Sequence, residues 1–375
     1  MANISQIIDC LRLINTEGIG AVSYAKFIKT YGTAAASLAF LSKQNKKIPS
    51  LNWAEKEIEL SQKYNVRILL TDDEDYPLLL KNLHDAPPVL YAKGKTELLN
   101  AQPAVAVVGR RNASLNARKL TEKIAFDLTE KNVLIISGMA RGIDAAAHNG
   151  ALEACSGHGS TIAVLGTGID KIYPPENSNL YHLIENQGLL LSEVPFNSSA
   201  TAANFPRRNR IVAGLSAGVL VTEASEKSGS LITAKFGAAQ NKLLFAIPGN
   251  PLDPRAAGTN RLLKSGAVLT ESAEDILKVL NSPQNILSKP KPADFCGDLF
   301  TNALDNCTKT TDISTNPKYP IEDFLSAEPA DIDEIIRCSE LDTATVMMQI
   351  LDLEMEGKII RLPGNKIALS GKTRK

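Results

Sequence analysis

The fold class is decided by residues 104–114, which read AVAVVGRRNAS. A short β-branched run ends there in a glycine, two arginines and small polar residues, and a stretch of helical periodicity follows. The same order of strand-like run, small or polar loop and helical stretch recurs as far as residue 270. The expected strands are Ala104–Val108, Val133–Ser137, Thr161–Leu165, Leu189–Ser192, Gly218–Thr222 and Leu243–Ile247. Runs that are apolar on both faces and separated by helix-length crossovers predict an α/β fold with a Rossmann-like, doubly wound, mostly parallel sheet.

The regions on either side of this sheet domain, which we place at 71–280, have other patterns. Residues 1–70 alternate helical periods around the turn Glu17-Gly18-Ile19-Gly20, which predicts a small helical domain. The turn resembles a helix-hairpin-helix, whose amides can receive a DNA phosphate, and a plain interhelical turn is the open alternative. Periodicity is absent from 281–319, a predicted linker. Residues 320–375 predict a winged helix with helices at Ile321–Leu325, Ile332–Arg337 and Thr343–Glu356 and a two-stranded wing.

Composition narrows the class of protein. The first residues show no basic region followed by an apolar run, and nowhere do 18 apolar residues occur in succession. We therefore expect a protein of the cytoplasm that is neither exported nor inserted in a membrane. The five cysteines are scattered without a C-x-x-C pair, and the four histidines lack metal-ligand spacing. Neither a disulfide framework nor a metal site is indicated, and no cofactor is expected.

Charge is divided unevenly along a chain that has 41 basic and 41 acidic residues in all. Residues 102–270 hold 17 Lys and Arg against 12 Asp and Glu, a net charge of +5. Residues 320–370 hold 4 against 11, a net charge of −7. An anionic ligand should therefore prefer the sheet domain.

Glycine-rich, arginine-flanked loops follow several of the expected strands. In an open parallel sheet, ligands bind beyond the carboxyl ends of the strands, so these loops are the candidate site. Glycine lets the backbone approach a phosphate, and the helix N-terminus behind it supplies unpaired amides. Several such loops side by side suit a run of phosphates better than a single one. For any one loop, a tight turn without a ligand is the simpler explanation, and Arg208 and Arg210 taken alone are compatible with a solvated helix face.

Motifs for catalysis are weak. No G-x-x-x-x-G-K-[ST] occurs, and Gly166-Thr167-Gly168 lacks the third glycine of a dinucleotide loop because position 171 is Lys. An alternative is a nucleotide-binding hydrolase similar to the phosphoribohydrolases, but Pro248-Gly249-Asn250 departs from their P-G-G-x-G-T loop. Asp144 and His148, four residues apart on an expected helix, suggest either an acid–base pair or a local hydrogen bond that braces the loop. We expect no enzyme activity.

Taken in order, the loops resemble the signature of the DprA/Smf (DNA-processing protein A) family. The motifs Tyr76-Pro77, Pro87-Pro88-Val89-Leu90-Tyr91, Pro248-Gly249-Asn250 and Gly258-Thr259-Asn260 strengthen the resemblance, which covers about residues 65–270. It implies a SAM-like N-terminal domain, a C-terminal winged helix and a homodimer formed through the Rossmann-like domain. It further implies that the protein binds and protects single-stranded DNA, displaces or bypasses single-strand-binding protein, and loads RecA in natural transformation.

The loops and the resemblance together give the candidate DNA-contacting residues. They are Arg110, Arg111, Ser114, Gly138, Arg141, Gly142, Phe205, Arg207, Arg208, Asn209, Arg210, Ser228, Gly229, Ser230 and Thr233. The chain departs from the family pattern at two positions. Arg110 stands where serine is usual, which adds charge, and Glu176 stands where some relatives have lysine, which weakens that corner of the groove.

The expected recognition helix of the winged domain contains no Lys or Arg and carries Asp352, Glu354 and Glu356. Such a composition is unsuited to lying beside phosphates. We therefore expect this domain to contact protein or to regulate, and not to read duplex DNA.

Overall fold

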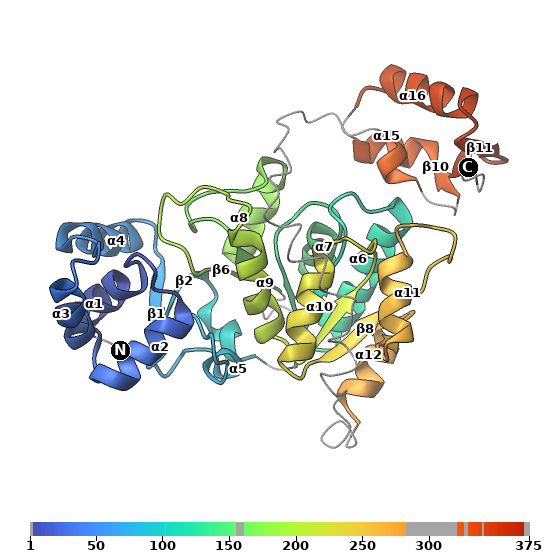
Figure 1. The fold of residues 1–375 in the computed structure, drawn as a ribbon. Coiled ribbons are helices and arrows are strands. Elements are labelled where there is room, and N and C mark those ends of the chain that lie inside the picture. The colour runs from blue at the N-terminus through green and yellow to red at the C-terminus, as the bar shows by residue number, and fades with distance from the viewer. Residues whose placement is uncertain are drawn as a thin grey trace.

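A computed structural model describes residues 3–101, 103–154, 161–282, 321–325, 329–339 and 341–370 (Figure 1). The predicted linker, 281–319, lies outside these residues apart from its first two positions. Four helices lead into a large helix-covered sheet, and a small domain of helices and strands ends the chain (Figure 1).

The central sheet has nine strands in the order β1-β2-β6-β5-β4-β3-β7-β8-β9. They are β1 (Arg67–Leu70), β2 (Val89–Gly94), β3 (Ala104–Val108), β4 (Leu134–Ser137), β5 (Thr161–Leu165), β6 (Leu189–Ser192), β7 (Gly218–Val221), β8 (Leu243–Ala246) and β9 (Val268–Leu269). From β6 to β9 neighbouring strands are parallel, whereas β2 pairs antiparallel with both β1 and β6. The expected doubly wound, mostly parallel sheet is confirmed, and each of its six predicted strands agrees to within one residue at either end.

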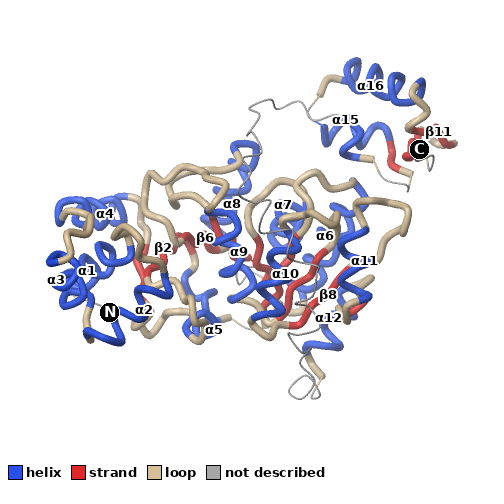
Figure 2. The backbone as a smooth tube through the Cα atoms, viewed as in Figure 1, coloured by secondary structure: helices blue, strands red, loops and turns tan. Residues whose placement is uncertain are grey.

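Helices cover both faces of the sheet (Figure 2). One face packs against α5 (Leu78–Lys81), α9 (Asn204–Gly214), α10 (Ser230–Ala239) and α11 (Ala257–Lys264), and the other against α6 (Leu115–Glu130), α7 (Ile143–Glu153), α8 (Ser178–Gln187) and α12 (Ala273–Leu280). Short 3₁₀ turns lie at Thr96–Asn100 and Pro175–Asn177. None of the helices in the described part of the chain has both the length and the apolar character needed to cross a membrane.

The N-terminal helices are α1 (Ile4–Ile14), α2 (Ala21–Tyr31), α3 (Ala34–Lys43) and α4 (Leu51–Lys63). Their buried residues form one core with side chains of the neighbouring sheet strands, such as Leu70, Tyr91 and Leu190. Buried Glu57 of α4 ties the two parts together, because its carboxylate accepts hydrogen bonds from the Tyr91 hydroxyl at 2.8 Å and the Phe196 amide at 3.2 Å. The sheet thus begins at residue 67, before the predicted boundary at 70, and β1, β2 and β9 were not among the expected strands.

The C-terminal domain is a winged helix. It contains a 3₁₀ turn at Ile321–Phe324, α15 (Ile332–Ser339), α16 (Thr343–Met355) and a sheet in the order β10-β12-β11, from β10 (Ala330–Asp331), β11 (Ile359–Leu362) and β12 (Lys366–Leu369). The first expected helix is therefore a 3₁₀ turn, and the wing sheet has three strands where two were predicted. Leu115, at the start of α6, is buried in the core of this domain, and Lys119 of α6 pairs with Glu334 of α15.

Helix α7 crosses α6 closely and carries polar side chains into the interior. Gly150 makes this crossing possible, since an added Cβ would lie 2.9 Å from Cα of Glu122 and nearer still to its carbonyl oxygen. Asp144 accepts hydrogen bonds from the amides of Gly138 and Ala140, so it braces the loop after β4.

The expected pairing of Asp144 with His148 is wrong. Nδ1 of His148 lies 2.7 Å from the Thr161 hydroxyl of β5, and Nε2 has no hydrogen-bond partner among the described residues. Desolvation, with Arg208 nearby, lowers the pKa of this fully buried ring to about 3.

We expect Gly150→Ala to destabilise the protein by about 1–3 kcal/mol, because the new methyl group must push α6 away from α7. Urea unfolding checks the free energy change. The control is Asn149→Ala on the exposed side of the same helix, which should be neutral or slightly stabilising since Ala favours helices. Equal stability of the two variants would contradict the close crossing.

The buried neutral His148 predicts a pH dependence of stability. Its folded pKa of about 3 lies below the ordinary 6.5, so its contribution is complete above pH 6.5 and is lost as the pH falls toward 3. The stability difference between wild type and His148→Gln should therefore fall by about 1.4 kcal/mol per pH unit between these limits. Urea unfolding across this range measures it, and a stability difference that stays constant with pH would contradict the buried neutral ring.

Candidate nucleic-acid interface

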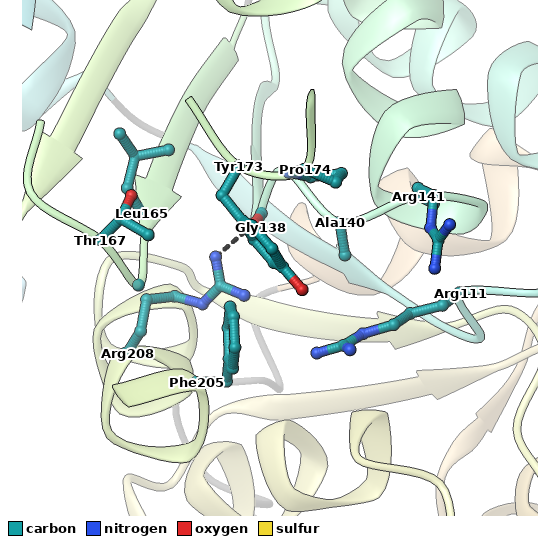
Figure 3. A pocket seen from close by; sticks show the side chains of 11 residues that line it. Arg111, Gly138, Ala140, Arg141, Leu165, Thr167, Tyr173, Pro174, Phe205 and Arg208 are labelled. Atoms are coloured by element: carbon teal, nitrogen blue, oxygen red, sulfur yellow. Dashed lines mark hydrogen bonds between the residues drawn. The ribbon is translucent and has the colours of Figure 1, made fainter. Parts of the chain in front are cut away.

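A small pocket lies at the carboxyl ends of β3, β4 and β5, against the start of α9 (Figure 3). It is lined by Arg111, Gly138, Ala140, Arg141, Leu165, Gly166, Thr167, Tyr173, Pro174, Phe205 and Arg208. Its enclosed volume is about 20 Å³, which suffices for a water molecule and not for a nucleobase. A larger ligand must therefore lie across the mouth of the pocket or displace a lining side chain.

Arg208 forms the floor of this pocket. Its side chain is 5% exposed and donates a hydrogen bond to the carbonyl oxygen of Gly138 (Figure 3). It donates another to the carbonyl oxygen of Val164. Burial lowers its pKa to about 10, partly offset by the nearby Asp144 carboxylate, so the guanidinium remains charged at neutral pH. Arg208 is therefore a fixed positive charge beneath the pocket, and the solvated helix face considered for it is wrong.

At three glycines around the pocket, other protein atoms occupy the space that a side chain would need. A Cβ at Gly138 would lie 2.5 Å from the Arg208 guanidinium carbon, and one at Gly166 would lie 3.0 Å from the Phe205 ring. Gly142 has φ +75°, and its missing Cβ makes room for the backbone carbonyls of Arg110 and Arg111. At these positions the absent side chain lets the loops pack against α9 and against one another, which is the simpler explanation weighed from the sequence.

Arg111 and Phe205 face each other at the accessible side of the pocket. The Arg111 side chain is exposed, and its guanidinium carbon lies 5.0 Å from the centre of the Phe205 ring in a cation–π contact. The rings of Tyr173 and Phe205 lie 5.5 Å apart and are tilted by 38°. Tyr173 was not among the candidate residues, although its position in the loop after the carboxyl end of β5 was a sufficient signal.

Arg141 sits at the rim beside the family departure at position 176. Its guanidinium pairs with the Glu176 carboxylate at 3.3 Å. Glu176 therefore neutralises part of the positive charge at the corner where some relatives place lysine.

Arg110 and Ser114 turn away from the pocket toward Glu223. The amide and hydroxyl of Ser114 donate to the Glu223 carboxylate at 3.1 and 2.7 Å, and the Arg110 guanidinium lies 3.7 Å from it. Ser114 is buried and caps α6 by accepting a hydrogen bond from the Ala117 amide. In this structure both residues serve the loop after β3.

The remaining basic residues of α9 differ in burial. Arg210 is 6% exposed and pairs with Glu193 and Asp85, so it is not a solvated helix-face charge. Arg207 is exposed and, with Arg210, borders a second hollow that is also lined by the Gly-Ile-Gly turn, residues 18–20, and the start of α2, residues 21–23. The side-chain oxygen of Asn209 accepts a hydrogen bond from Nε of Arg208.

The candidates at the start of α10 lie apart from the pocket. Ser228 and Ser230 hydroxyls are 2.7 Å apart, and Ser230 and Thr233 are 7% and 1% exposed. Gly229 is open to solvent. The pocket thus gathers Arg111, Gly138, Arg141, Phe205 and Arg208 out of the fifteen candidates. Within the described residues, no cluster of three or more His, Cys, Asp or Glu could hold a metal ion.

Comparisons with known proteins agree with this architecture. A family model described as DNA recombination-mediator protein A matches residues 67–281, and models of a DprA-like N-terminal HHH domain and a DprA winged helix domain match residues 5–59 and 309–365. Protein Smf of Synechocystis sp. is 36% identical over 82% of this chain and 81% of its own length. DNA processing protein DprA of Streptococcus pneumoniae is 44% identical over 55% of this chain and 71% of its own length.

Solved structures lead to the same family. The X-ray structure of DprA from Streptococcus pneumoniae has a TM-score of 0.58 and 36% identity, and the match covers 73% of this chain and 92% of that one. The structure of DprA from Helicobacter pylori, which describes a single-stranded DNA binding mode, has a TM-score of 0.52 and 30% identity over 58% of this chain and 96% of that one. The resemblance drawn from the loops is therefore confirmed, and the chain belongs to the DNA recombination-mediator protein A (DprA/Smf) family.

Proposed function

We propose that this chain is a recombination mediator that binds single-stranded DNA across the pocket at the ends of β3, β4 and β5. The observation that carries the proposal is the exposed Arg111 guanidinium, held over the Phe205 ring above the fixed charge of Arg208. Proteins that bind single strands without reading their sequence combine basic side chains with accessible aromatic rings. The Helicobacter pylori relative with its single-stranded DNA binding mode supports the choice of ligand.

The exposed arginines would bind the phosphates. Arg111 and Arg207 are exposed, whereas Arg208 and Arg210 are buried and held by protein partners. The N–H groups of a buried guanidinium that donate to protein oxygens are not available to a phosphate, whereas an exposed guanidinium can donate its hydrogen bonds to the ligand. We therefore assign direct contacts to Arg111 and Arg207 and a background charge to Arg208.

Arg111 would change partners when DNA binds. In the free protein it covers the face of Phe205, where a stacked base would lie, and the small pocket leaves no room for both. If Arg111 swings to a phosphate, the ring becomes free for the neighbouring base. Backbone and stacking contacts carry no base code, so sequence preference should be slight.

The cellular part of the proposal comes from the family. We propose that the protein protects single-stranded DNA in the cytoplasm, displaces or bypasses single-strand-binding protein, and loads RecA in natural transformation. A homodimer through the Rossmann-like domain would present two DNA sites at once and so raise the avidity for one long strand.

The alternative of a nucleotide hydrolase finds less support in the pocket. The residues that line it include no carboxylate, histidine or cysteine to transfer a proton or attack a substrate. Two hydroxyl groups line it, those of Thr167 and Tyr173, and the Thr167 hydroxyl already donates to the carbonyl of Lys171 at 2.9 Å. Assays of nucleotide cleavage with purified protein distinguish the two functions, since a protein that consumes a free mononucleotide and ignores oligonucleotides would be the hydrolase.

We expect Arg111→Ala to weaken binding of a labelled oligothymidylate about tenfold to a hundredfold, because a charge-assisted hydrogen bond to phosphate is lost. The slope of log affinity against log salt should also become shallower by about 0.7. Fluorescence anisotropy at several salt concentrations measures both. The control is Lys131→Ala, which removes an exposed charge at the amino-end edge of the sheet and should change neither quantity by much. Unchanged affinity in Arg111→Ala would refute the site.

Phe205→Ala should weaken the same complex by about 1–3 kcal/mol while leaving the salt slope unchanged, because it removes stacking and no charge. Phe205→Trp, which keeps an aromatic face, should retain most of the affinity. The same anisotropy titration checks both variants. A salt slope that falls in Phe205→Ala, or equal losses in the two variants, would argue against base stacking on this ring.

A further inference from the structure

Helix α16 of the winged domain exposes a continuous apolar face, defined here as the α16 stripe. It consists of Met347, Met348, Leu351 and Met355, which are 39%, 62%, 52% and 79% exposed. The spacing of three, four and eight residues puts all four side chains on one side of a helix, over a length of about 12 Å. Single exposed apolar residues are ordinary, but four on one helical face mark an interaction surface.

The stripe is not the face that builds the domain. Val346, Ile350 and Leu353 lie on the opposite side of α16 and are buried against the rest of the winged helix. The domain meets the sheet domain through α15 and the start of α6, and α16 lies on the far side of α15 (Figure 1). Among the described residues nothing covers the stripe, and Ile360 of β11, 48% exposed, adds a further apolar side chain to the surface of the domain.

Acidic residues accompany the stripe. Asp352 and Glu354 flank it on either side along the helix, and Glu356 follows its end. Arg361 pairs with Glu354 at 2.9 Å and Lys358 with Glu356 at 2.8 Å, yet residues 320–370 keep 11 acidic against 4 basic residues. A ligand that covers the stripe thus meets a negative rim.

We propose that the α16 stripe binds a basic amphipathic helix of a partner protein. Methionine side chains adapt to differently shaped apolar surfaces, and a short apolar helical face offers anchors for the i, i+3/i+4 and i+7 positions of a second helix. The negative rim selects lysine and arginine on the flanks of that helix. The same charge disfavours nucleic acid, and it disfavours a second copy of this domain, which would bring two net charges of −7 together.

The test uses the full chain and three fluorescent peptides of 18 or so residues, enough for about five helical turns. The first has Leu at helical spacing and Lys on its other faces, the second replaces every Lys with Glu, and the third scrambles the first so that no apolar face remains. Anisotropy should show saturable binding of the first peptide only, weakening as salt rises. A first peptide that fails to bind, or a Glu or scrambled peptide that binds equally well, overturns the proposal.

Two variants locate the contact. Met348→Ser with Met355→Ser should weaken binding of the Lys peptide at least tenfold, and Asp352→Lys should weaken it and reduce its salt dependence. The matched control is Leu183→Ser, which removes an exposed apolar side chain, 46% exposed, from α8. All variants change exposed side chains, so circular dichroism should be unchanged. If the double variant instead alters oligomeric state in sedimentation, or loses binding of a duplex oligonucleotide, the occupant is a second copy or DNA and the proposal is wrong.

Discussion

The buried Arg208 guanidinium is the contact around which the pocket is assembled. It joins helix α9 to the loop after β4 through the Gly138 carbonyl and to the end of β5 through the Val164 carbonyl. Asp144 holds the same loop from the other side by accepting the Gly138 and Ala140 amides. A buried cation is stable only when its hydrogen bonds are satisfied, so these partners must keep their places together. The floor of the pocket is accordingly held in place by hydrogen bonds from three directions, namely α9, the loop after β4 and the end of β5.

The arginines of this chain divide into two kinds that the sequence does not separate. Arg207, Arg208 and Arg210 lie within four residues of one another, but a helix turns them in different directions. Arg208 and Arg210 point inward and meet carbonyls and carboxylates, whereas Arg207 faces solvent. Two of the three arginines of this motif therefore stabilise the fold. Fewer arginines are available to bind a phosphate than the number of arginines in the motif implies.

Most of the fold followed from the sequence because β-branched runs and helix-length crossovers leave few alternatives for the sheet. The strands that were missed are at its edges. β1 and β2 pair antiparallel with only the four-residue helix α5 between them, and β9 has two residues. The structure has a pocket where the rule that ligands bind at the carboxyl ends of strands predicts a site. The sequence did not show which groups lie against each glycine. The space beside Gly138 is taken by the Arg208 side chain, and the space beside Gly142 by the carbonyls of Arg110 and Arg111, and only the fold brings these groups together.

The separation of charge between domains also constrains the path of DNA in the proposed function. The winged domain, with its net charge of −7, packs on α6, whose first residues follow directly on the loop that carries Arg111. Like charges repel within a Debye length of about 8 Å at physiological salt, so a strand at the pocket is kept from continuing over that domain. The exposed Arg207 and the Gly-Ile-Gly turn lie on the other side, along α9 toward the N-terminal helices. Electrostatics therefore favours a strand that leaves the pocket in that direction and leaves the acidic domain free for protein.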